Sequence, residues 1–161
     1  MNTETETKTE EISLEPRKIY LKDVSFESPV SPGVFTRGQV KPAMDLQLML
    51  HHKKLEKQFH EVVLQITATS KVEDETLFLV EVHQAGIFEI QCEDAAKLTM
   101  VKEIACANIL LPFARETIAD LVAKGGFPQL LINPVNFEAL YQQNREKEQQ
   151  ANQTPTSESI N

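Results

Sequence analysis

The sequence predicts an α+β protein in which a four-stranded antiparallel sheet carries two helices packed on one of its faces. In the first half of the chain apolar residues recur at every second position, and in the second half they recur at helical spacing. Polar, turn-forming segments separate the alternating stretches, as antiparallel strands require. Strands that come first and helices that follow are typical of the α+β class.

The composition is that of one soluble domain. The 161 residues are 41% hydrophobic and carry 16 Lys and Arg against 24 Asp and Glu, a net charge of -8. A chain of this length can bury a core of its own. The acidic balance argues against nucleic acid as the main partner, because phosphate groups require a basic surface. It favours basic partners instead.

The sequence also argues against secretion and against direct insertion into a membrane. No apolar run approaches the roughly 20 residues of a membrane-spanning helix. The first residues lack the basic and apolar segments of a signal peptide. Cys92 and Cys106 form neither a disulfide framework nor a CxxC motif. We therefore expect a cytoplasmic protein.

Two polar tails flank the expected domain. Residues 1–15 carry five glutamates against one lysine and few apolar side chains, which is typical of a disordered acidic tail. Residues 142–161 are rich in Gln and Asn and end in turn-forming residues, so we expect a second disordered tail there. The folded domain is expected to span residues 16–141.

Four stretches of the first half alternate between apolar and polar residues. The first, residues 20–28, ends before Pro29, and a Pro- and Gly-rich loop follows that is long enough to be functional. Further strands are expected at 43–51, 59–71 and 77–90, with a hairpin turn at 73–75. We expect Leu77, Leu79, Glu81 and His83 to face outward. The side chains expected to face the core are Val24, Phe26, Met44, Leu46, Leu48, Leu50, Val62, Leu64, Ile66, Ala68, Phe78, Val80 and Val82.

The second half predicts two helices. Apolar residues from Leu110 to Val122 follow helical spacing, Asn108 suits the N-cap, and Gly125 can adopt the left-handed conformation of a C-terminal cap. Residues 95–107 are expected to add a helical turn or two. A second helix should begin near Asn136 and carry a short apolar stripe. That stripe consists of Phe137, Leu140 and Tyr141.

Residue patterns typical of enzymes or of metal and cofactor sites are missing from the sequence. His51 and His52 are adjacent on a strand and point to opposite faces, so they cannot chelate one ion. Cys106 lies among small apolar residues and is expected to be buried rather than reactive. There is no P-loop, no GxGxxG and no GxSxG. We expect a protein that is not an enzyme and has no cofactor and no metal.

The outward face of the sheet combines carboxylates with leucines. By alternation, Asp23 and Glu27 share this face with Leu77, Leu79 and Glu81. One interpretation is a solvated face that tolerates two leucines. The other is a docking surface for a basic partner. The apolar residues also exceed what a small core needs, so an interface or a groove is expected.

Several segments resemble, in order and spacing, the SecB family of protein-export chaperones. They are IYLKDVSFESP, EVVLQITATS, ETLFLVEVHQAGIF, CANILLPFARETIADLVAKGGFPQL and PVNFEALY, and they cover most of residues 19–141. The resemblance implies a homotetramer, built as a dimer of dimers, that acts as an ATP-independent holdase. It implies two partners besides the chain itself, namely unfolded secretory preproteins and the SecA motor ATPase that receives them.

The resemblance also suggests residues for each role. Those for SecA docking are Asp23, Glu27, Leu79 and Glu81, and those that support subunit assembly are Val80, Val82 and Gln84. For the client groove we expect Phe35, Phe137, Leu140 and Tyr141, although each is also a plausible core residue. The C-terminal tail is rich in Gln and Asn and carries Arg145 and Lys147, whereas an acidic tail is usual in the family, so no secondary contact of this tail with SecA is assigned. The alternatives are a SecB-like chaperone dedicated to one antitoxin and an α+β enzyme or small-ligand binder.

Overall fold

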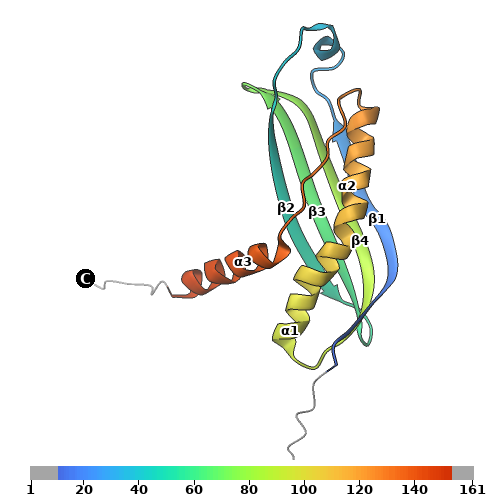
Figure 1. Cartoon of the computed structure of the whole chain (residues 1–161), viewed down its shortest axis with the longest axis vertical. Coiled ribbons are helices and arrows are strands. Elements are labelled where there is room, and N and C mark those ends of the chain that lie inside the picture. Colours follow the sequence, from blue (N-terminus) through green and yellow to red (C-terminus); the bar gives the residue numbers. More distant parts are fainter. Residues whose placement is uncertain (1–10, 154–161) are drawn as a thin grey trace, which may run out of the picture.

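The computed structural model describes residues 11–153, and its four strands form one antiparallel sheet in the order β1-β4-β3-β2. Figure 1 shows this sheet with helices over one face. This is the expected α+β class. The strands are β1 (Ser13–Glu27), β2 (Ala43–Lys54), β3 (Phe59–Val72) and β4 (Glu75–Gln91). A short 3-10 helix, η1 (Gly33–Thr36), lies between β1 and β2. The helices are α1 (Ala95–Met100), a π-helical segment η2 (Val101–Cys106), α2 (Ala107–Lys124) and α3 (Phe137–Asn152).

The core lies between the sheet and α2, as the alternation predicts. In β3, Val62, Leu64, Ile66 and Ala68 are fully buried, and they pack with Val80 and Val82 of β4. From α2, Leu110, Ala114, Ile118 and Val122 cover these strands at spacings of four residues, the repeat of a helix face. This packing fixes which sheet face is covered and which is left free of helices.

Strand β1 begins earlier than the sequence suggests, because two bulges interrupt its alternation. Its pairing with β4 shifts between Pro16 and Lys18 and again between Leu21 and Asp23. Each bulge inserts one residue and moves the side chains that follow it to the opposite face. Residues 13–15, assigned above to the N-terminal tail, therefore belong to the sheet, which corrects that boundary. Residues 1–10 of that tail lie outside the described residues.

The expected outward position of Leu77 is wrong. The pairing of β3 with β4 shifts between Ser70 and Lys71, so that Ser70 pairs with Phe78 and Lys71 with Thr76. Leu77 falls into this irregularity, is buried, and joins the core. Its carbonyl oxygen accepts a hydrogen bond from the Ser28 hydroxyl at 2.9 Å.

Asn108 is not an N-cap, because α1, η2 and α2 follow one another without a break from Ala95 to Lys124. The cap is Asp94, whose carboxylate accepts hydrogen bonds from the backbone N–H groups of Ala96 and Lys97. The π-helical segment adds one residue to a turn and so shifts the apolar stripe, which makes residues 95–107 look separate from α2 in a search at period 3.6.

After α2, residues 126–136 run back over the helix-covered face to α3, which points away from the sheet past β2 (Figure 1). Asn136 caps α3 by accepting a hydrogen bond from the Ala139 N–H. Residues 142–152, expected to be disordered, are helical here, which corrects the second tail boundary. Residues 154–161 lie outside the described residues. No helix within residues 11–153 is long and apolar enough to cross a membrane.

Candidate functional site

An apolar groove runs beside β2, between this strand and the segment from Gly126 to the start of α3. It consists of three adjoining cavities of about 390, 570 and 320 Å³. Met44 and Leu130 line both the first and the second cavity, and Leu48 and Leu140 line both the second and the third. These shared walls make the three cavities one groove, which we call the β2 groove.

Aromatic rings form the end of the groove near η1, which we call the Phe35 pocket. The Phe127 ring lies between those of Phe35 and Phe78, with centroid distances of 5.3 and 4.9 Å. Phe35 is 51% exposed, so about half of its surface is free for contact. The left-handed conformation expected at Gly125 is found one residue later: Gly125 has φ -69°, whereas Gly126 has φ +87°. A Cβ at Gly126 would meet the Phe35 ring at 3.0 Å. Glycine is therefore needed both for the turn after α2 and for the position of this ring.

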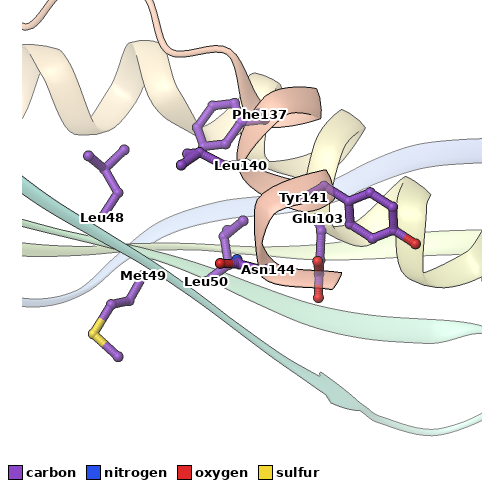
Figure 2. A pocket seen from close by; sticks show the side chains of 8 residues that line it. All are labelled: Leu48, Met49, Leu50, Glu103, Phe137, Leu140, Tyr141 and Asn144. Carbon is purple, nitrogen blue, oxygen red and sulfur yellow. The ribbon is translucent and has the colours of Figure 1, made fainter. Parts of the chain in front are cut away.

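The opposite end of the groove lies between β2, η2 and α3. Figure 2 shows Leu48 and Leu50 on the sheet side and Phe137, Leu140 and Tyr141 on the helix side. Polar side chains complete this end: Glu103 from η2 and Asn144 from α3.

Among the expected groove residues, Phe137 and Tyr141 are core-like. Phe137 is 2% exposed and belongs to the hydrophobic core. Tyr141 is also buried, and its hydroxyl accepts a hydrogen bond from Nη1 of Arg145 at 2.7 Å. Leu140 keeps accessible surface and lines two of the cavities. Phe35 lies at the other end, so the structure spreads these four residues along the groove instead of gathering them at one point.

Strand β2 adds surface that sequence reasoning placed in the core. Met44 is 42% exposed, and Leu46 is exposed as well, because no helix covers the first half of β2. This strand is also an edge of the sheet. An edge strand presents unpaired N–H and C=O groups, to which an extended peptide can add as a further strand. The groove thus offers apolar side chains and a free backbone edge together.

The helix-free face of the sheet carries the four residues expected to dock SecA. Glu27 pairs directly with Leu79, Ser25 with Glu81, and Asp23 with His83 across β1 and β4. Asp23 and Glu27 are exposed, whereas Leu79 and Glu81 are half-buried. Nε2 of His83 lies 2.7 Å from a carboxylate oxygen of Glu81, and the Thr67 hydroxyl donates to the other oxygen at 3.2 Å. The alternation therefore places all four on one surface, which we call the acidic face.

The residues expected to support subunit assembly are not on a surface. Val80 and Val82 have no exposed area, and they face α2 within the same chain. Gln84 is buried too, and its Nε2 donates to the backbone oxygen of Tyr20 at 3.0 Å. In the single chain these side chains hold β4 against α2 and against β1, so their support of subunit assembly, which stays a prediction, would act through the packing of β4.

A polar network that sequence reasoning missed ties β1 to β3 on the helix-free face. Glu61 accepts hydrogen bonds from Nζ of Lys22 at 2.8 Å and from the Tyr20 hydroxyl. The Lys22 hydrogen bond, followed by that of Tyr20, lowers the pKa of Glu61 below its ordinary value. Burial, helped by Glu61, raises the pKa of Tyr20 to about 12. The Lys22 bulge brings its amino group toward β3, a feature that alternation does not reveal.

Cysteine and histidine side chains form no metal-binding cluster in the part of the chain that the structure describes, although His51, His52 and His83 line one small cavity. Cys106 is fully buried as expected, and burial raises the pKa of its thiol to about 12. Nε2 of His51 is 3.3 Å from the Gln65 side chain, and that of His52 is 3.4 Å from Glu103. Within residues 11–153, no group of three or more His, Cys, Asp or Glu side chains could hold a metal ion.

An apolar groove beside a free sheet edge is typical of proteins that bind extended polypeptide. The family model for the preprotein translocase subunit SecB matches residues 6–148. The protein-export protein SecB of Nitrosococcus oceani is 48% identical to this chain over 93% of its length and 92% of the relative's. That of Pseudomonas fluorescens is 47% identical over 87% and 86%. This chain belongs to the SecB family of protein-export chaperones.

A solved structure agrees with this assignment at the level of the fold. The SecB-like chaperone of Mycobacterium tuberculosis, in complex with a peptide from the HigA1 antitoxin, superposes with a TM-score of 0.64. The two chains are 16% identical, over 76% of this chain and 91% of the other. At this identity the comparison supports the α+β fold and carries no statement about the client.

Proposed function

We propose that the protein is an ATP-independent cytoplasmic holdase that binds unfolded secretory preproteins in the β2 groove and delivers them to SecA. The observation that carries this proposal is the continuity of the groove. Each cavity shares two wall residues with the next: Met44 and Leu130 at one junction, and Leu48 and Leu140 at the other. A chain that has not yet folded exposes apolar side chains and unpaired backbone at once, and the groove with its sheet edge matches both.

The source of the binding energy explains why no nucleotide is needed. Burial of apolar area on a preformed surface is favourable by itself. Because such burial depends on area rather than on direction, the groove accepts many sequences, and a folded protein, which has buried these groups, is rejected. The chain also lacks a P-loop. Client release would then depend on a partner and not on hydrolysis by this protein.

SecA docking is assigned to the acidic face. Asp23, Glu27 and Glu81 give this face its negative charge, and Leu79 supplies an apolar contact among them. A basic segment of the partner would find complementary potential there, which speeds association and fixes the register. The acidic face lies on the helix-free side of the sheet and the groove on the other, so client and motor would not compete for one surface.

Assembly into a tetramer, as a dimer of dimers, is part of the proposal. Leu21 and Val24 of β1 and Met100 and Phe113 of the long helix keep large exposed fractions in the single chain. Apolar surface of this kind is typical of a chain that is covered in its assembly. β1 is moreover a second free edge of the sheet.

Aggregation of a denatured client tests the holding function. The protein should suppress aggregation of a preprotein diluted from urea, equally with and without ATP, and should leave the native form of the same client unbound. Equal affinity for native and denatured client, or holding that requires ATP, would contradict the proposal. Co-purification of SecA and several uncleaved precursors from cytosol would indicate a general export chaperone. Co-purification of a single antitoxin would indicate a chaperone dedicated to that client.

A further inference from the structure

A serine hydroxyl beneath the Phe35 pocket has no hydrogen-bond partner. Ser70 lies on the helix side of β3, between its strand partners Met44 and Phe78. It is 1% exposed, and its Oγ finds no partner among the described residues. A buried hydroxyl without a partner costs stability, and an alanine here would avoid that cost. An orphaned group of this kind calls for a functional explanation.

The position of Ser70 connects this hydroxyl to the groove. Ser70 lines the Phe35 pocket together with Phe127 and Leu130. With about 390 Å³, the pocket falls within the roughly 300–1,000 Å³ of sites that hold small ligands. Its rings favour an aromatic side chain, because aromatic pairs attract beyond their area burial. At the base of this apolar pocket, Ser70 supplies a group that can both donate and accept a hydrogen bond.

We propose that Ser70 is a specificity-determining residue that selects tyrosine over phenylalanine in the bound client. The tyrosine ring would lie against Phe35 and Phe127, and its phenol group would reach Oγ of Ser70. Met44 lies directly across from Ser70, lines the same pocket and is 42% exposed. Its flexible side chain can turn aside to uncover the hydroxyl. The inference rests on the proposed function, since it requires that the β2 groove binds client chain.

Two labelled, unstructured peptides that differ only in a central Tyr or Phe provide the test. By fluorescence anisotropy, the unmodified protein should bind the Tyr peptide about three- to tenfold more tightly, the effect of one net hydrogen bond. Ser70→Ala should remove this preference by weakening the Tyr peptide alone. Thr69→Ala, on the opposite face of the same strand, should preserve it. Phe35→Ala should weaken both peptides.

The outcomes separate this inference from the holdase function. Equal affinities for the two peptides, or a preference that survives Ser70→Ala, would overturn the role of Ser70. If the peptides do not bind, or if Phe35→Ala leaves their affinity unchanged, the pocket is not their binding site. Suppression of aggregation would then still support the holdase function. A protein that neither binds peptide nor holds denatured client would refute both. Urea unfolding should show Ser70→Ala to be at least as stable as the unmodified protein.

Discussion

Val24 and Val82 face each other across β1 and β4, yet Val82 has no exposed surface while Val24 keeps 38% of its own. The difference arises because α2 covers the centre of the sheet, while part of Val24, on the edge strand β1, stays uncovered. Val82 therefore stabilises the fold, whereas Val24 is available for contact with another chain.

Aspartate substitutions at these two positions should have separate effects. Val82→Asp places a carboxylate in the core without a partner and should lower the free energy of unfolding by about 3–5 kcal/mol. Val24→Asp should cost only about 1 kcal/mol but should reduce the mass of the assembly. Urea unfolding and light scattering measure the two effects. A Val82→Asp protein that is fully stable and monomeric would show that Val82 lies in an interface after all.

Phe137 and Leu140 should also respond differently. Phe137→Ala leaves a cavity in the core and should cost about 3 kcal/mol of stability. Leu140→Ala removes a half-buried groove wall, so it should cost less stability and weaken client holding more. Urea unfolding and aggregation assays on the same preparations give both quantities. If Leu140→Ala holds denatured client as well as the unmodified protein, the α3 end of the groove does not contact client.

Charge reversal on the acidic face should separate docking from holding. Asp23→Lys combined with Glu81→Lys should leave the fold intact, because Asp23 is exposed, the Glu81 side chain is 33% exposed, and ion pairs open to solvent contribute about 0–1 kcal/mol each. SecA binding should fall by more than tenfold, because like charges would then face each other across the interface. The control, Glu56→Lys with Asp74→Lys, makes the same change of charge at two exposed turns. Calorimetric titration with SecA measures the affinity of each variant. If the Asp23→Lys, Glu81→Lys protein binds SecA as tightly as the unmodified protein does, the acidic face is not the SecA-docking surface.

The Tyr20–Glu61 pair predicts how stability depends on pH. The pKa of Glu61 is lowered in the folded chain, first by Lys22 and then by Tyr20. Its contribution is therefore present above the ordinary carboxyl pKa and is lost as the pH falls through the lowered folded value. The pKa of Tyr20 is raised to about 12, so stability should decline between about pH 10 and 12 as the unfolded chain releases this proton first.

Single substitutions assign these two effects. Tyr20→Phe should remove the decline between about pH 10 and 12, and Glu61→Gln should flatten the acid limb. Urea unfolding at a series of pH values gives both curves. An acid limb that is identical in Glu61→Gln would show that other carboxylates determine it.

Sequence reasoning succeeds where one period persists along an element. In β3 and in the middle of β4 strict alternation identifies Val62, Leu64, Val80 and Val82 as core, because a helix covers one face throughout. It fails where a residue is inserted. The bulges of β1 and the irregularity at Leu77 reverse the faces, and the π-helical segment shifts a helical stripe. Each insertion is a local event without its own composition signal.

The groove was only partly predictable for a related reason. A hydrophobic residue on a strand or helix indicates burial but not what covers it. Met44 and Phe137 both belong to apolar stripes in the sequence, yet Met44 is exposed and Phe137 is buried, because the start of α3 packs against η2 and no helix covers the first half of β2. Whether the Ser70 hydroxyl has a hydrogen-bond partner depends on all of its neighbouring side chains, so no short sequence pattern predicts that it lacks one.

Photo-crosslinking of a bound client tests the central claim most directly. A photoreactive side chain at Leu46 in the groove wall, and in a separate variant at Thr67 on the helix-free face, would report which surface a denatured preprotein occupies. We expect strong crosslinks from position 46, weak ones from position 67, and loss of the former when the client is native. Crosslinks that are equal at the two positions, or stronger at 67, would contradict the assignment of client binding to the β2 groove.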